Sequence, residues 1–260
     1  MLIHGLASTQ HIWDLVIPQL ERSFRITAFD QRGHGESSKP NGGYTFDEVC
    51  ADLGAVLRAI EARRPILVGH SYGANVAIDY SARHPRAVGG VVSVDGGMGS
   101  ISEIMDWTAA REALAPPKLA GIHIDEFMTM ARSDLGRRWR PQTAEIVRSL
   151  FEIDARGRIK PRLRRANHMR ILRAMYLQKP KQLLATIEPP TLMFCARPRA
   201  HVMDGERGFY EMKLRAVSQI RAANPRIRIE WITSIHDIPV DRPDELAARL
   251  ARFAREEART

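Results

Sequence analysis

The stretch that decides the fold is Pro65-Ile66-Leu67-Val68-Gly69-His70-Ser71-Tyr72-Gly73. Its apolar run at 66–68 is short and uninterrupted, which is typical of a strand buried on both faces of a parallel sheet. A G-x-S-x-G sequence follows, and a helical pattern comes after it. In this strand–turn–helix context two glycines flank the serine because the turn is too tight for a Cβ, and the hydroxyl projects from the sheet edge. Ser71 is therefore predicted to be a nucleophile above a helix N-terminus, which offers backbone N–H groups.

Short apolar runs recur on both sides of this stretch and alternate with helical patterns. Further strands are expected at 24–29, 88–94, 191–195 and 227–232, and helices at 44–62, 207–223 and 243–256. Thr45 and Glu48 have the spacing of a capping box at the start of the first of these helices. This alternation predicts an α/β fold with a mostly parallel central sheet and helices on both faces.

Between residues 99 and 185 the pattern changes to helical periodicity alone, with breaks at proline and glycine. An all-helical lid is therefore expected over residues 99–185, inserted into a core made of residues 1–98 and 186–260. Most of its large apolar side chains are expected to pack within the lid itself. Some must still face the sheet edge, and the candidate substrate contacts are His70, Trp107, Phe127, Trp139 and His168.

His236 is the candidate general base. It follows the late strand expected at 227–232 and precedes the final helix. A serine hydroxyl is a poor nucleophile at neutral pH and needs an imidazole to take its proton. Among the nine histidines, His236 is the one at the end of a late strand downstream of the serine.

With these residues in place, the chain resembles the α/β-hydrolase superfamily over almost all of its length. The other motifs that carry the resemblance are an oxyanion loop, a D-x-R-G-H-G-x-S loop and a histidine loop, found here as His4-Gly5-Leu6 with Trp13, Asp30 to Ser37, and His236 with Asp241-Arg242-Pro243. The resemblance implies that the backbone N–H groups of Leu6 and Tyr72 form the oxyanion hole. It also implies that Asp30, Arg32 and His34 hold loops together and are not catalytic.

The carboxylate that would orient the imidazole stays open at this point. Most members of the superfamily place it after the strand that follows the lid, where this chain has Arg199. Asp95, at the end of the strand expected at 88–94, is favoured, and Asp204 is the alternative. Either is chemically adequate, because the carboxylate has only to orient the imidazole and stabilise its cation.

The start of the chain also departs from the family pattern. Members usually begin with a β-hairpin, whereas this sequence starts inside the strand before His4-Gly5, so that hairpin is expected to be missing. Met1-Leu2-Ile3 lacks the charged region and the following apolar stretch of a secretory signal. A cytoplasmic setting is expected.

Composition excludes several classes of protein. At 260 residues, 44% hydrophobic and 27% charged, the chain can bury a sizeable core and is not disordered. No apolar run approaches the ~18–20 residues of a membrane span. The net charge of +9 lies mostly in residues 100–185, where 17 Lys and Arg face 9 Asp and Glu, interleaved with apolar residues. Such interleaving is typical of solvated helix faces, so no nucleic-acid partner is expected. Metal and cofactor motifs are absent, so none is expected.

Together these features predict a serine hydrolase that cleaves a carboxylic ester of a small, largely apolar substrate through an acyl-enzyme. The expected partner is a small molecule, and the chain is expected to be a monomer or a homodimer. A thioesterase, a lactonase, a carbon–carbon bond hydrolase and a lyase stay open. A non-catalytic ligand-binding role also stays open, because a fold alone does not fix a function.

Overall fold

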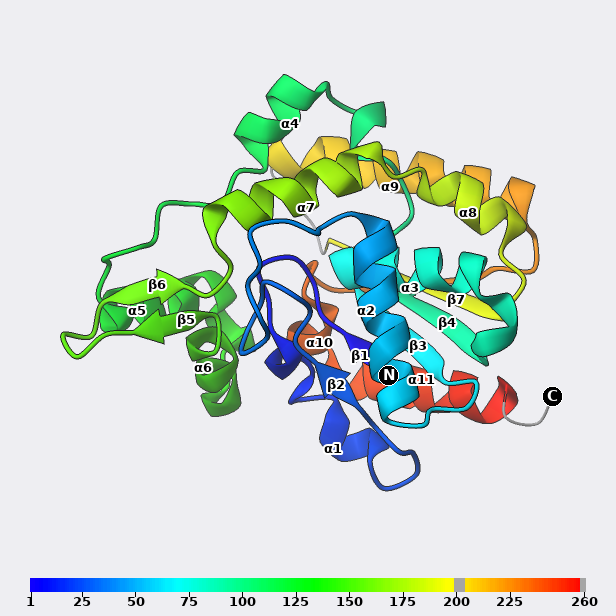
Figure 1. The fold of residues 1–260 in the computed structure, drawn as a ribbon, viewed down its shortest axis with the longest axis horizontal. Coiled ribbons are helices and arrows are strands. Elements are labelled where there is room, and N and C mark those ends of the chain that lie inside the picture. Colours follow the sequence, from blue (N-terminus) through cyan, green and yellow to red (C-terminus); the bar gives the residue numbers. More distant parts are fainter. Residues whose placement is uncertain (199–203, 258–260) are drawn as a thin grey trace.

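A six-stranded parallel sheet forms the centre of the molecule (Figure 1). The computed structural model describes residues 1–198 and 204–257. The strands are β1 (Leu2–Ile3), β2 (Ala28–Phe29), β3 (Ile66–His70), β4 (Gly90–Val94), β7 (Thr191–Arg197) and β8 (Arg228–Thr233). Their order is β2-β1-β3-β4-β7-β8, and every neighbouring pair is parallel. The predicted parallel sheet is confirmed, although the strand expected at 24–29 forms only at its end.

Alternate side chains of the strands pack into two cores, one on each face of the sheet. In β3, Leu67 belongs to the first core and Val68 to the second, as the two-residue period of a strand requires. The helices that close the first core are α2 (Phe46–Ala59), α3 (Tyr72–Arg83), α8 (Pro180–Thr186) and α9 (Asp204–Ala223). The second core is closed by α1 (Ile17–Leu20) and α11 (Pro243–Glu257), which lie below the sheet in Figure 1. The predicted helices on both faces are therefore confirmed.

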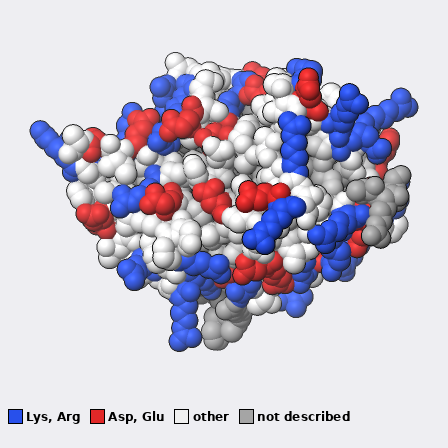
Figure 2. All heavy atoms as spheres, turned by 90° about the horizontal axis from the view of Figure 1, so that it is seen from below, with Lys and Arg blue, Asp and Glu red and all other residues white. Residues whose placement is uncertain are grey.

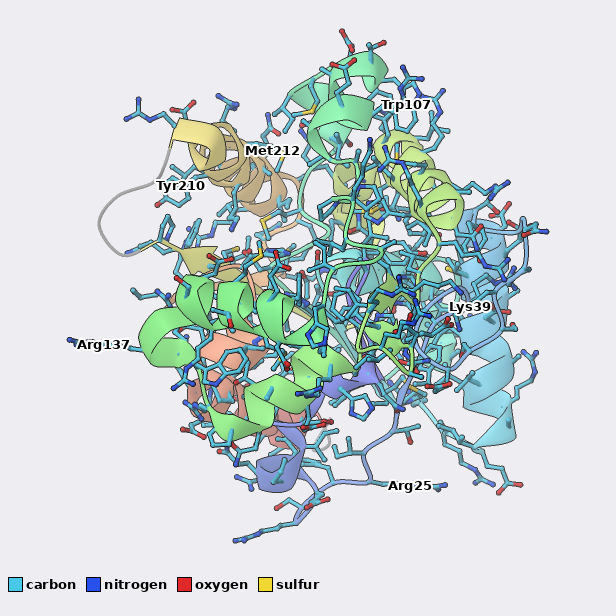
Figure 3. All side chains as sticks on the ribbon, turned by 90° about the vertical axis from the view of Figure 1, so that its left-hand side faces the viewer. Arg25, Lys39, Trp107, Arg137, Tyr210 and Met212 are labelled. Atoms are coloured by element: carbon cyan, nitrogen blue, oxygen red, sulfur yellow. The ribbon has the colours of Figure 1, made fainter. Side chains whose placement is uncertain are left out.

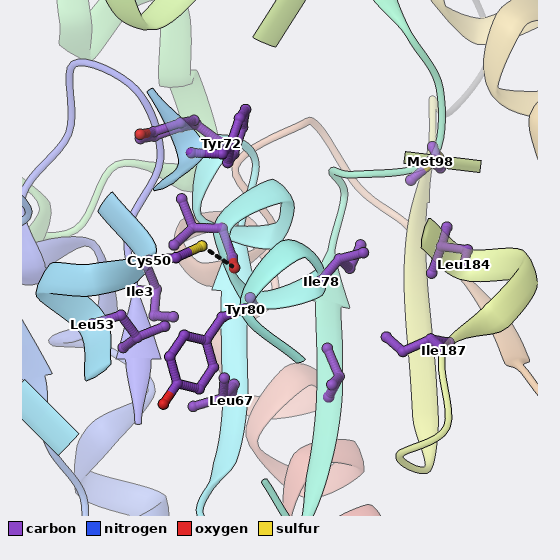
Figure 4. Close-up of a cluster of buried hydrophobic side chains, with 14 of the residues drawn as sticks. Ile3, Cys50, Leu53, Leu67, Tyr72, Ile78, Tyr80, Met98, Leu184 and Ile187 are labelled. Atoms are coloured by element: carbon purple, nitrogen blue, oxygen red, sulfur yellow. Dashed lines mark hydrogen bonds between the residues drawn. The ribbon is translucent and has the colours of Figure 1, made fainter. Parts of the chain in front are cut away.

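Helix α2 begins where its capping residues predict. The Glu48 carboxylate accepts the backbone N–H of Thr45 at 2.9 Å, which satisfies a donor that the helix leaves free. Cys50 and Leu53 lie on the buried side of α2, within the first core (Figure 4). Cys50 and Cys195 are both buried free thiols, and burial raises the pKa of each to about 12. Neither is a thiolate at neutral pH.

The segment between β4 and β7 leaves the sheet and returns to it. Before α8 it contains α4 (Trp107–Ala113), α5 (Ile124–Leu135), α6 (Pro141–Arg148), β5 (Phe151–Ile153), β6 (Ile159–Pro161) and α7 (Arg165–Leu177). In Figure 1 α4 and α7 lie above the sheet, and the hairpin lies beside it with α5 and α6.

The expectation of an all-helical segment at 99–185 is wrong at this hairpin, because β5 and β6 pair antiparallel. The turn between them is fixed by Asp154, whose carboxylate accepts the N–H groups of Arg156 and Arg158, each at 2.9 Å. Each strand has only three residues, which is too short for the period-two pattern to stand out from a helical one.

A buried polar network attaches the end of this segment to α3. Gln178 follows α7 and accepts a hydrogen bond from Asn75 Nδ2 at 2.6 Å. The amide of Gln178 also donates to Asp79 Oδ2 at 2.7 Å. All three side chains are buried. Buried amides and carboxylates must find partners, so the network holds this turn in one place against the helix that follows Ser71.

The surface carries charges of both signs. On the face seen in Figure 2, basic and acidic side chains are interspersed. In the described part of the chain, no helix combines the length and the apolar character that crossing a membrane would require.

Candidate active site

Ser71 sits on a sharp turn between β3 and α3. Its backbone has φ 53° and ψ −119°, in the left-handed half of the map, where a non-glycine residue is strained. The chain can pass here because its neighbours lack side chains: a Cβ on Gly69 would lie 2.2 Å from the oxygen of Gly73. A Cβ on Gly73 would lie 2.3 Å from the oxygen of Ile3. The two glycines of G-x-S-x-G are thus required by backbone contacts on both sides of the serine.

His236 lies next to Ser71, in the loop after β8. Its Nε2 is 3.0 Å from Ser71 Oγ, and its Nδ1 is 2.8 Å from Asp95 Oδ2. The side chain of His236 is 55% exposed, so the ring meets solvent on one side and Asp95 on the other. The structure therefore brings together the serine, the histidine and the favoured carboxylate of the sequence analysis.

Asp95 follows β4 and is buried, with a φ of 46° that turns its side chain toward the histidine loop. Its Oδ1 accepts the backbone N–H of Ala196 and the Nζ of Lys213, each at 2.7 Å. Its Oδ2 is left for His236. The alternative carboxylate, Asp204, begins α9, and its side chain lies outside the described residues.

Burial and charge have opposite effects on the pKa values of His236 and Asp95. Burial lowers the pKa of His236, but the hydrogen bond and the negative charge of Asp95 outweigh it, and the net shift is upward. Burial likewise raises the pKa of Asp95, and the contacts with His236 and Lys213 reverse this into a net decrease. Asp95 is therefore ionised at neutral pH, where it can hold the His236 Nδ1–H and leave Nε2 free to accept a proton.

The resemblance assigns the oxyanion hole to the backbone N–H groups of Tyr72 and Leu6, which both lie near Ser71. Tyr72 is the first residue of α3, so its N–H has no partner within the helix. Leu6 lines the same cavity as Ser71. The residue before it, Gly5, approaches Ser71 so closely that an added Cβ would lie 3.1 Å from the serine Cβ. Tyr72 and Leu6 thus belong to segments next to Ser71, and their role as oxyanion donors stays a prediction.

Neutral histidines support the loop that carries Leu6. His4 Nε2 accepts the N–H of Gln31 at 3.0 Å, and His34 Nε2 accepts the N–H of Ala7 at 3.2 Å. Burial lowers the pKa of His4 to about 4 and that of His34 to about 3. Both rings are therefore neutral at physiological pH, as an accepting nitrogen requires.

His70 supports the histidine loop and does not line the cavity. Its buried ring donates from Nε2 to the backbone oxygen of His236 at 3.1 Å. In the described part of the chain, His70, His236 and Asp237 form the one group of three that could face a metal ion, with ligand atoms within 4.8 Å of one another. Both ring nitrogens of His236 already have partners, Asp95 and Ser71.

A cavity of about 850 Å³ opens above Ser71. Its walls are mostly apolar and come from the β4 end, the inserted segment, α9 and the histidine loop; among them are Met98, Ile101, Leu114, Pro116, Leu172, Met175, Tyr210 and Met212. Figure 3 shows Tyr210 and Met212 on α9. His168, on α7, also lines the cavity, as one of the five candidate contacts.

The other aromatic candidates pack elsewhere. Trp107 packs edge-to-face against Tyr176, at 5.3 Å between ring centroids, and Phe127 packs in the same way against Phe151, at 4.8 Å. Neither they nor Trp139 are among the residues that line the cavity. Trp107 and Phe127 thus pack within the inserted segment itself, which is what helical spacing favoured for most of its large side chains.

Among the described residues, the two basic side chains of the cavity wall, Lys213 and Arg138, both have acidic partners. Lys213 pairs with Asp95, and Arg138 donates from Nε to the buried Asp241 at 3.0 Å. Arg137, beside it in the chain, points away from the body of the protein (Figure 3). Sequence reasoning missed Lys213 and Arg138. No local signal marks either one, because each gains its position only when distant segments pack.

Comparison with known protein families gives a match over most of the chain. A family model described as the alpha/beta hydrolase fold matches residues 1–175. The chain belongs to the α/β-hydrolase family. The resemblance drawn from the motifs is confirmed.

Individual α/β hydrolases match parts of the sequence. A 2-(acetamidomethylene)succinate hydrolase of Mesorhizobium japonicum is 35% identical over 95 residues, 36% of this chain and 34% of the relative. Epoxide hydrolase B of Mycobacterium tuberculosis is 36% identical over 97 residues, 36% of this chain and 27% of that enzyme. These alignments span about a third of the length of the curated relatives.

Solved α/β-hydrolase structures match nearly the whole chain. E-2-(acetamidomethylene)succinate hydrolase superposes with a TM-score of 0.79 and 21% identity, over 97% of this chain and 90% of the other. A thioesterase domain from the curacin biosynthetic pathway gives a TM-score of 0.73 and 15% identity, over 96% and 89%. At these identities the superpositions establish the fold.

Proposed function

We propose that this α/β hydrolase is a serine hydrolase that cleaves a carboxylic ester of a small, largely apolar substrate through an acyl-enzyme. The observation that carries the proposal is the continuous contact from Ser71 Oγ through His236 to Asp95, at 3.0 Å and 2.8 Å. A hydroxyl, an imidazole and a carboxylate in this order are what is needed to activate a serine at neutral pH.

The proposed reaction has two halves, acylation of Ser71 and hydrolysis of the acyl-enzyme. Ser71 Oγ attacks the ester carbonyl as its proton passes to His236 Nε2, and the oxyanion accepts the N–H groups of Leu6 and Tyr72. The carbon–oxygen bond to the alcohol then breaks, and the alcohol leaves with the proton from His236. Water, deprotonated by the same nitrogen, attacks the acyl group and releases the acid and Ser71. Each oxyanion donor should lower the barrier by about 3 kcal/mol.

The cavity supports an uncharged substrate. Its walls are rich in methionine and aliphatic side chains, which adapt to apolar groups of different shapes. In the part of the wall that the structure describes, the two cations already pair with Asp95 and Asp241. A substrate carboxylate would have to compete with these partners, so a neutral acyl or alcohol group is favoured.

Intact mass after incubation with a fluorophosphonate tests the nucleophile. The expected result is one adduct on the wild type and none on Ser71→Ala. Ser81→Ala, which removes a buried serine of α3 away from the turn, is the matched control and should be labelled like the wild type. A folded wild type without an adduct would contradict the proposal and favour the ligand-binding role.

Turnover of matched substrates then tests the bond. Butyryl esters and butyryl thioesters of neutral alcohols and thiols should be compared with a hemisuccinate ester, which carries one carboxylate. Faster hydrolysis of the neutral ester is expected. A preference for the thioester would assign a thioesterase. A preference for the hemisuccinate would contradict the uncharged substrate and bring this chain nearer to its relative named for a succinate derivative.

A further inference from the structure

Lys213 lies against the carboxylate that faces His236. It projects from α9, and its Nζ donates to Asp95 Oδ1 at 2.7 Å and to the backbone oxygen of Ala196 at 3.1 Å. Its side chain is only 16% exposed, and it lines the cavity above Ser71. Asp95 Oδ1 already accepts the N–H of Ala196 at 2.7 Å. The lysine is therefore not needed merely to satisfy the carboxylate.

Two physical effects follow from this contact. First, two donors on Oδ1 prevent the Asp95 carboxylate from rotating, so Oδ2 stays at 2.8 Å from His236 Nδ1. A catalytic group held in this way keeps the reacting atoms aligned, and small displacements of such a group lower the rate strongly. Second, the positive charge of Lys213 beside Oδ1 offsets part of the negative charge that the imidazole senses from Asp95. The contact between Lys213 and Asp95 is buried, and charge interactions are stronger there than in water.

The other titratable groups that face His236 do not supply a positive charge. His70 approaches from β3 and is kept neutral because burial lowers its pKa. Asp95 approaches from the end of β4, and Asp237 belongs to the same loop as His236; both carry negative charge. Lys213, from α9, is the member of this set that is positive at neutral pH, and its charge opposes protonation of His236.

We propose that Lys213 is a positioning residue of this site: it holds the Asp95 carboxylate with Oδ2 toward His236 and offsets part of its negative charge. The inference rests on the proposed roles of Ser71, His236 and Asp95. Lys213 acts through Asp95 and not on the ester. Its consequence is that His236 accepts the serine proton at a lower pH than a plain Asp–His pair would allow.

The test compares Lys213→Met, which removes the charge, with Lys213→Arg, which keeps it. Lys181→Met is the matched control, because Lys181 also pairs with a carboxylate, Glu103 at 2.8 Å, but does not line the cavity. The rate of fluorophosphonate labelling is measured against pH. The ring resonance of His236, identified by its absence in His236→Gln, is titrated by NMR in the same proteins. If circular dichroism shows that Lys213→Met does not fold, Lys213→Gln is used in its place.

In Lys213→Met, the midpoint of the labelling rate against pH and the NMR midpoint of His236 should both move upward by about one pH unit. The substitution should also slow labelling at high pH on the order of tenfold. Lys213→Arg and Lys181→Met should keep the wild-type midpoint. An unchanged midpoint in Lys213→Met overturns the inference. A wild type that takes no phosphonate refutes the proposed function instead, and the NMR midpoint still decides whether Lys213 acts on His236.

Discussion

Replacement of Asp95 by asparagine is a stringent perturbation of this site, because the structure dictates how the amide must sit. Asp95 Oδ1 accepts two donors, the N–H of Ala196 and the Nζ of Lys213. An asparagine has one oxygen and one NH₂ group. Its oxygen must take the Oδ1 position, since the NH₂ group there would face both donors. The NH₂ group is then directed at His236 Nδ1, where the wild type has an acceptor at 2.8 Å.

This arrangement forces the wrong tautomer on the base. With a donor facing Nδ1, the proton of the neutral imidazole moves to Nε2, the nitrogen that is 3.0 Å from Ser71 Oγ. Nε2 can then no longer accept the serine proton. Such a change lowers kcat on the order of 10⁴-fold, which corresponds to about 5.4 kcal/mol in the barrier.

The assay is kcat for a chromogenic butyrate ester, together with the rate of fluorophosphonate labelling. Asp79→Asn is the matched control, because Asp79 is equally buried and also bound by a cation, Arg83, but belongs to the network with Gln178. It is expected to alter stability with little effect on kcat per folded molecule. If Asp95→Asn keeps kcat within a few-fold of the wild type, the assignment of Asp95 as the orienting carboxylate is refuted.

Three further outcomes are expected. Ester turnover should fall as the pH drops through the His236 pKa, which lies above its usual 6.5 because the Asp95 contact outweighs burial; a rate that stays level down to about pH 5 would rule out this base. His34, with a pKa lowered by burial to about 3, stays neutral in the folded state while the unfolded chain binds a proton, so stability is lost as the pH falls below about 6.5. Urea unfolding should thus show the advantage of wild type over His34→Gln shrinking by about 2 kcal/mol between about pH 7 and about pH 5, and a constant difference would contradict this. Gly73→Ala should lower the free energy of unfolding by about 3 kcal/mol, because its Cβ would lie 2.3 Å from a backbone oxygen. Gly42→Ala, whose Cβ would have nothing within 4 Å, should lower it little. Equal melting temperatures of the two variants would disprove the steric argument.

The parts of the fold that the sequence predicts are those fixed by local patterns. The apolar run before Gly69 and the helical period after Ser71 predicted the turn between β3 and α3, and Thr45 with Glu48 predicted the start of α2. The hairpin of β5 and β6 was missed because its strands have three residues each. Pairing between such short strands depends on the Asp154 turn and on neighbouring helices more than on their own pattern.

The residues of the site also divide into those that a local sequence pattern predicts and those that only packing brings into place. Ser71 and His236 could be proposed because each follows a recognisable strand. The sequence favoured Asp95 over Asp204 but did not decide between them, since the choice depends on how close the end of β4 comes to the loop after β8. Lys213 and Arg138 had no sequence signal, because a basic residue on a helix looks the same whether it meets solvent or a buried carboxylate.

Polar contacts attach the inserted segment to the core at several points along its length. Arg138 fastens one point to Asp241, near the histidine loop, and Gln178 fastens another to Asn75, on the helix after Ser71. Between them runs α7, where Asn167 donates to Tyr44 Oη at 2.6 Å while His168, Leu172 and Met175 face the cavity. A stretch grafted from another hydrolase would have to reproduce a guanidinium at one junction and an amide at the other. A graft that kept these contacts would replace part of the cavity wall and leave Ser71 and His236 in place.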